Sequence, residues 1–102
     1  VQRTTSTISL QSLAMMNSDF ARARGRAFGR RLLREAPGAD ARVESAFALA
    51  VGRKPLPAER TAAREFLEAQ EVQYAGQPDQ EARVWADFGQ MLLAGNSFLY
   101  VE

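Results

Sequence analysis

Apolar residues recur at helical spacing along most of the 102-residue chain, and no segment shows the alternation typical of a strand. The pattern predicts a short helix over about 9–16 and longer helices over about 19–36, 41–51, 57–74 and 79–95. The connections between these segments are short, which favours antiparallel neighbours. We therefore predict an all-α fold, a compact bundle of about five short helices that forms a single domain over residues 1–102.

The segment 41–51 has the most regular apolar face. Its apolar residues follow the i, i+3, i+4, i+7, i+8 series, and they are Val43, Ala46, Phe47, Ala50 and Val51. Asp40 is expected to start this helix, and Gly52 is expected to cap its end. Pro57 suits the first position of the next helix.

The other predicted helices also have one apolar face each. The segment 57–74 offers Ala63, Phe66, Leu67 and Tyr74, and the last helix offers Val84, Trp85, Phe88, Met91 and Leu92. In the segment 19–36, two glycines at positions 25 and 29 lie on the apolar stripe. Because glycine disfavours a helix, its place on this stripe predicts the close approach of another helix.

The chain ends in an apolar segment, Phe98-Leu99-Tyr100-Val101, which follows a predicted helix end at Gly95-Asn96. Chain ends are usually polar and frayed. We expect this tail to pack back on the bundle.

The composition excludes several kinds of chemistry. Cysteine and histidine are both absent, so the chain has no disulfide, no thiolate nucleophile and no Ser-His-Asp triad. It also has no CxxCH haem attachment, and we expect no cofactor in this segment. Apolar runs are too short for a membrane span. The first residue is Val1 rather than Met, which suggests a fragment of a longer protein.

Charge is unevenly distributed although the net charge is only +1. Residues 1–54 hold ten basic and four acidic groups, a balance of +6, whereas residues 55–102 hold three basic and eight acidic groups, a balance of −5. The simplest interpretation is that the two halves attract each other within one fold.

Six arginines spread over the polar side of the segment 19–36. Guanidinium groups match planar oxyanions, so one hypothesis is an anion-binding face made of Arg22, Arg26, Arg30 and Arg34. The alternative is a solvated face that pairs with the acidic residues of the next long helix, Glu59, Glu65, Glu68 and Glu71. Nucleic acid is disfavoured as a partner, because no aromatic residue is interleaved with the arginines to stack bases.

Three other groups of residues are candidate sites. Asp79, Glu81 and Asp87 suggest acid–base chemistry, but the first two are explained by a helix start and no opposed pair stands out. The aromatic residues Trp85, Phe88, Phe98 and Tyr100 suit either a core or a sugar-stacking platform. Met15 and Met16 are a candidate interaction surface.

Three stretches together resemble a known family: STISLQSLAMMNSDF at 6–20, AFALAVGRKPLPAE at 46–59 and WADFGQMLLAGNSFLYVE at 85–102. They are similar to the C-terminal domain of planctomycete-type exported multidomain proteins, catalogued as domain of unknown function number fifteen fifty-three. The chain departs from that family's pattern at Ile8-Ser9 and at Ala94-Gly95, where caps and turns are affected.

The resemblance implies an exported parent protein, periplasmic or on the cell surface, in which cytochrome-c-like modules often lie upstream. Any haem would then belong to the parent and not to this segment. The expected role is a non-catalytic structural or interaction module whose partners are the upstream domains of the parent chain. The alternative is a module that binds anions or acidic polysaccharide through the arginine face.

Overall fold

The computed structural model describes residues 19–95, and in this range it contains four α-helices and no strand. The helices are α2 (Asp19–Glu35), α3 (Ala39–Ala50), α4 (Pro57–Gln73) and α5 (Gln80–Gly95). The all-α prediction is confirmed, and each helix boundary lies within two residues of the predicted one. The predicted helix 9–16, the residues Met15 and Met16, and the apolar tail 98–101 lie outside the described residues.

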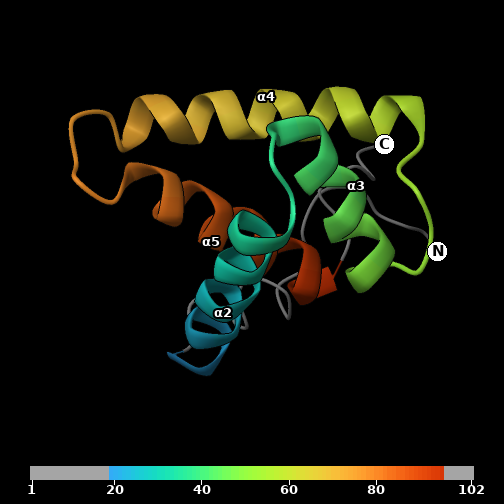
Figure 1. Ribbon diagram of the computed structural model, residues 1–102, viewed down its shortest axis with the longest axis horizontal. Coiled ribbons are helices and arrows are strands. Elements are labelled where there is room, and N and C mark those ends of the chain that lie inside the picture. Colours follow the sequence, from blue (N-terminus) through green and yellow to red (C-terminus); the bar gives the residue numbers. More distant parts are fainter. Residues whose placement is uncertain (1–18, 96–102) are drawn as a thin grey trace, which may run out of the picture.

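The helices α4 and α5 form an antiparallel pair, and α2 crosses α5 on the side away from α4 (Figure 1). The most extensive contact between two helices is that of α2 with α5, while α3 packs against both of them. The helix α5 is therefore the centre of the arrangement. This position agrees with its five buried apolar side chains, Val84, Trp85, Phe88, Met91 and Leu92.

The core consists of the apolar faces that the sequence predicts. One buried cluster joins the apolar face of α5 to Leu32 of α2, to Val43, Ala46 and Phe47 of α3, and to Ala63 and Leu67 of α4. The ring of Trp85 stands edge-on to that of Phe88, with 5.6 Å between their centroids.

Glycines allow α2 and α5 to approach closely. A Cβ atom placed on Gly29 would lie only 2.7 Å from the backbone nitrogen of Ala86. A Cβ atom on Gly25 would lie 2.7 Å from the Cβ of Gln90. The predicted close helix contact at these two glycines is confirmed, and the partner is α5.

Local signals in the sequence set most of the helix ends. Gly52 follows α3 with a φ of 87°, and its N–H donates to the Phe47 carbonyl, which closes the helix. Pro57 opens α4 as predicted. The start of α3 differs from the prediction: its N-cap is Gly38, and Asp40 lies in the first turn, where its charge still suits the helix dipole.

Candidate functional site

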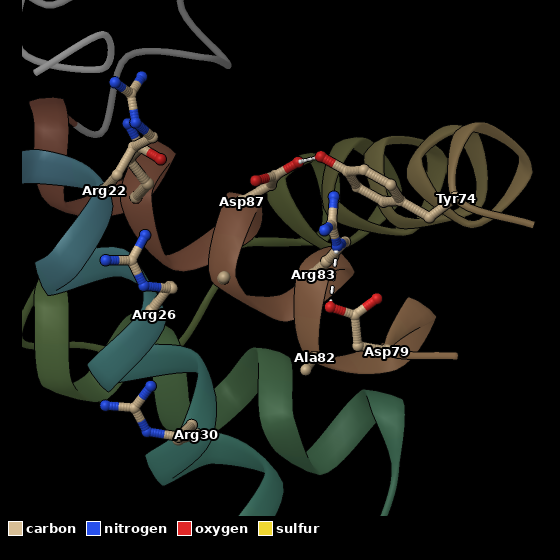
Figure 2. Close-up of a pocket in the computed structure, with 10 residues that line it drawn as sticks. Arg22, Arg26, Arg30, Tyr74, Asp79, Ala82, Arg83 and Asp87 are labelled. Atoms are coloured by element: carbon tan, nitrogen blue, oxygen red, sulfur yellow. Dashed lines mark hydrogen bonds and ion pairs between the residues drawn. The ribbon is translucent and has the colours of Figure 1, made fainter. Parts of the chain in front are cut away.

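A groove of about 380 Å³ runs between α2 and α5, beside their close crossing. One wall is formed by α2 and the other by α5 and the end of α4 (Figure 2). The residues that line it are Arg22, Arg26, Arg30, Tyr74, Asp79, Ala82, Arg83, Ala86, Asp87 and Gln90.

Three of the four arginines predicted to bind anions form the α2 wall. Arg22, Arg26 and Arg30 are spaced by four residues, so they share one face of the helix at intervals of about 6 Å. The buried stripe of Gly25 and Gly29 lies beside this face and holds it close to α5. The arginines are thereby placed at the edge of a groove rather than on an open surface.

The arginine wall is only weakly neutralised within the described residues. Arg22 pairs with Asp19 at 3.0 Å, and both side chains are well exposed. No ion pair within residues 19–95 involves Arg26 or Arg30. Like charges four residues apart disfavour a helix, so an anion placed between these two guanidinium groups would relieve their repulsion.

Arg34, the fourth predicted residue, lies one turn further along α2 and does not line the groove. The remaining α2 arginines make local contacts. Arg24 lies over the ring of Phe20, and Arg31 pairs with Glu35 at 3.2 Å.

The opposite wall holds a hydrogen-bonded carboxylate. The Tyr74 hydroxyl donates to Oδ2 of Asp87 at 2.6 Å, and the Gln70 side-chain amide donates to the same oxygen at 2.7 Å. The hydrogen bond to Asp87, together with burial, raises the pKa of Tyr74 to about 12. Tyr74 therefore remains a neutral donor at physiological pH.

A second pair lies at the rim of this wall. Arg83 donates to Asp79 at 3.0 Å, and its guanidinium lies 5.6 Å from the centroid of the Tyr74 ring. The hydrogen bond from Arg83 lowers the pKa of Asp79. The groove thus contains four guanidinium groups and two carboxylates, and it is net positive.

The predicted pairing of the arginine face with α4 is wrong for the described residues. The helix α4 packs against α5, and no ion pair within residues 19–95 joins an arginine of α2 to a carboxylate of α4. Glu59 instead pairs with Arg53 at 2.6 Å. Glu65, Glu68 and Glu71 form no ion pair with an arginine of α2.

The two oppositely charged halves of the chain attract each other in only some places. Arg42 pairs with Glu81 at 2.9 Å, in the expected sense. Arg60, however, pairs with Glu44 at 2.6 Å, which is the reverse sense, since the acidic partner belongs to the basic half. Within residues 19–95 the arginines of α2 form ion pairs only with Asp19 and Glu35 of the same helix, so the helix keeps a net positive charge.

A wider depression of about 570 Å³ lies near the starts of α3 and α5. Its lining includes Arg42, which pairs with Glu81 and lies over the Trp85 ring at 5.6 Å. Because that arginine is already matched, this depression is a weaker candidate for a charged ligand than the α2–α5 groove.

The other predicted sites find little support in the described residues. Trp85 and Phe88 are almost fully buried, so they belong to the core and cannot stack a sugar. Phe98 and Tyr100 lie outside the described residues. Each of Asp79, Glu81 and Asp87 has a separate partner, and residues 19–95 contain no cluster of three acidic side chains able to hold a metal ion.

Sequence reasoning missed the roles of Tyr74 and Asp87. Helical spacing predicts Tyr74 on the apolar face of α4, and the pattern of carboxylates suggests only acid–base chemistry for Asp87. One available signal was the short turn between α4 and α5, closed by Gly76 at a φ of 84°. A tight antiparallel hairpin brings the end of one helix beside the first turns of the next.

These features define a small all-α module with a basic groove. The chain belongs to the PSD1 family, described as "Protein of unknown function (DUF1553)", whose profile matches residues 1–67. The predicted family is thus confirmed, and the match includes the stretches 6–20 and 46–59 but not the stretch 85–102. No curated protein and no solved structure matches the chain.

Among residues 19–95, no helix has the length and apolar character needed to cross a membrane.

Proposed function

We propose that this chain is a non-catalytic binding module, and that the arginine wall of the α2–α5 groove (Arg22, Arg26 and Arg30) takes the oxyanion groups of an acidic ligand. The observation that carries the proposal is the placement of Arg26 and Arg30, which line a groove and form no ion pair within residues 19–95. Guanidinium groups donate paired hydrogen bonds to carboxylate, sulfate and phosphate.

The non-catalytic part of the proposal is supported by the state of the carboxylates. Asp87 accepts two hydrogen bonds, and Glu81 and Asp79 are each paired with an arginine. General acid–base catalysis uses opposed groups that are poised to exchange protons. Because each of these carboxylates is held by its own donors, they do not form such an opposed acid–base pair.

The setting of the module is proposed from the family resemblance. We place it at the C-terminus of an exported, multidomain bacterial protein of the planctomycete type, with cytochrome-c-like modules upstream. In this extracellular setting we expect the ligand to be an acidic polysaccharide.

The test is binding of the 102-residue chain to immobilised heparin, a sulfated polysaccharide, at low and at moderate salt. The double variant Arg26→Ala/Arg30→Ala should lose most of the binding, and the affinity of the wild type should fall as salt rises. The matched control is Arg31→Ala/Arg34→Ala, which removes the same charge from the same helix but outside the groove. No binding at low salt, or equal losses in the two variants, would overturn the proposal.

A second candidate function is docking on the upstream part of the parent chain. It is favoured by Phe20 at the start of α2, whose side chain is 70% exposed. Phe20 follows closely on Met15 and Met16, the predicted interaction surface. If this surface docks, Phe20→Ser should weaken association with the upstream segment of the parent protein without changing heparin binding. Unchanged association would exclude Phe20 from the surface.

A further inference from the structure

The wall of the groove that faces the arginines is mixed in charge, because its two carboxylates lie beside Arg83, which pairs with Asp79. It carries Asp87 and Asp79, whereas a site adapted to any polyanion would have only cations and neutral donors. A fully charged ligand gains from the arginines and is repelled chiefly by Asp87, which has no ion-pair partner within residues 19–95, whereas Asp79 is paired with Arg83. The groove therefore contains a repulsive element as well as an attractive one, which is how binding sites discriminate.

Among residues 19–95, no hydrogen bond ends on the second carboxylate oxygen of Asp87, Oδ1. Both of its hydrogen bonds, from Tyr74 and from Gln70, end on Oδ2. Figure 2 shows the second oxygen turned away from the Tyr74 hydroxyl. Because two donors hold the carboxylate in place, Oδ1 is a fixed acceptor on the groove wall, and a hydroxyl group of a ligand is a suitable donor to it.

We infer that the groove selects ligands that carry hydroxyl groups beside their oxyanions, which makes an acidic polysaccharide its ligand class. The oxyanions meet Arg26 and Arg30 on α2, and a neighbouring sugar hydroxyl donates to Oδ1 of Asp87. The arginine wall from Arg22 to Arg30 spans about 12 Å, which suits a chain molecule with repeated acidic groups. Tyr74 is a positioning residue that holds the Asp87 carboxylate. This inference rests on the proposed function.

Polyphosphate and single-stranded DNA are the contrasting ligands. Their backbones present oxyanions but no hydroxyl groups, so no backbone group beside the oxyanion donates to Asp87. They experience its charge only as repulsion.

The test compares the binding of two polyanions to the 102-residue chain: alginate, a polyuronate with hydroxyl groups, and inorganic polyphosphate. Asp87→Asn removes the negative charge while nearly preserving the shape of the side chain. We expect the affinity for alginate to fall roughly tenfold, as for the loss of a hydrogen bond to a charged group, and the affinity for polyphosphate to rise. A groove that acts through charge alone would bind both ligands more tightly, and that result would overturn the inference.

Two further variants complete the experiment. Tyr74→Phe leaves the charge unchanged but releases the carboxylate, so alginate binding should weaken while polyphosphate binding stays the same. Glu81→Gln, which neutralises a carboxylate of α5 outside the groove, should change neither affinity. If Asp87→Asn does not fold, the Tyr74→Phe result decides, and equal changes for the two ligands would overturn the inference.

The outcomes separate this inference from the proposed function. If Arg26→Ala/Arg30→Ala changes the affinity for neither ligand, the proposed anion-binding function is wrong. If that variant lowers the affinity for both ligands while Asp87→Asn raises the affinity for both, the groove binds anions but does not select for hydroxyl groups.

Discussion

The Tyr74 hydroxyl donates a hydrogen bond of 2.6 Å to Oδ2 of Asp87, and it joins the end of α4 to the middle of α5. Both side chains are partly buried, and the acceptor is a carboxylate. Hydrogen bonds to charged groups contribute more to stability than neutral ones. This bond therefore fastens the α4–α5 hairpin as well as fixing one wall of the groove.

Replacing Tyr74 with Phe removes this hydrogen bond and keeps the ring in place. We expect a loss of about 1.5 kcal/mol in the free energy of unfolding, because Asp87 keeps the Gln70 amide as a donor. Urea denaturation should show a lower midpoint with an unchanged slope. The control is Val72→Ala, an exposed position near the end of α4, which should change stability by less than about 0.5 kcal/mol. Equal effects of the two variants would contradict the prediction.

The same bond predicts a dependence on pH in the alkaline range. The pKa of Tyr74 is raised to about 12 in the folded chain, chiefly by the hydrogen bond to Asp87. Unfolding returns it to about 10, so the folded state favours the neutral phenol. The resulting stabilisation is fully present below about pH 10 and is lost as the pH rises from about 10 to about 12.

An absorbance titration of tyrosine ionisation checks this prediction. The chain has two tyrosines, so Tyr100→Phe leaves Tyr74 as the only one that titrates. A midpoint near 12 is expected, and a midpoint near the ordinary value of about 10 would contradict it. The alkaline loss of stability should also be smaller in Tyr74→Phe.

The crossing of α2 and α5 makes a prediction about glycine. Alanine favours a helix by about 1 kcal/mol over glycine, so Gly29→Ala would stabilise an isolated α2. In the folded chain the new Cβ would lie 2.7 Å from the Ala86 nitrogen, and backbone atoms cannot swing aside. We expect a net destabilisation of about 1–3 kcal/mol in thermal or urea unfolding.

Gly89→Ala is the matched control for this crossing. Its added Cβ would also meet an atom at 2.7 Å, but that atom is the Cδ2 of the Phe28 side chain. A ring can rotate away where a backbone cannot, so Gly89→Ala should be clearly milder than Gly29→Ala. Equal or greater stability of Gly29→Ala would mean that the two helices do not cross as closely as described.

Most of the fold follows from spacing along the chain. Val43, Ala46 and Phe47 were assigned to a core face by their i, i+3, i+4 positions, and all three are buried. Gly25 and Gly29 indicated a close helix contact because only packing compensates for their low helix propensity. Such signals are local, so one sequence suffices to read them.

The composition of the site was harder to predict, since it depends on which helices face each other. Helical spacing correctly placed Arg22, Arg26 and Arg30 on one face but did not show what lies opposite. The acidic residues of α4 were expected there, and α5 stands there instead with Asp87. Helix periodicity defines a face of each helix, whereas the choice of partner depends on how all the apolar faces pack together.

The turn between α3 and α4 supplies the last prediction. The Glu59 side chain is almost fully buried, and it accepts two hydrogen bonds from Arg53, at 2.6 and 2.8 Å. It also accepts the Leu56 N–H at 2.8 Å, a backbone donor that the first turn of α4 leaves free. The residue therefore fixes both the turn and the start of the helix.

Glu59→Ala should cost about 2 kcal/mol in the free energy of unfolding, because these charge-assisted hydrogen bonds disappear together. The cost stays below that of breaking a fully buried pair, since Arg53 is 40% exposed and water can solvate it. Glu59→Gln keeps an acceptor for the Leu56 N–H and should recover part of the loss. Glu65→Ala, at an exposed position on the same helix, should change stability by no more than about 0.5 kcal/mol. If Glu59→Ala proves as mild as Glu65→Ala in urea denaturation, the carboxylate does not organise this turn.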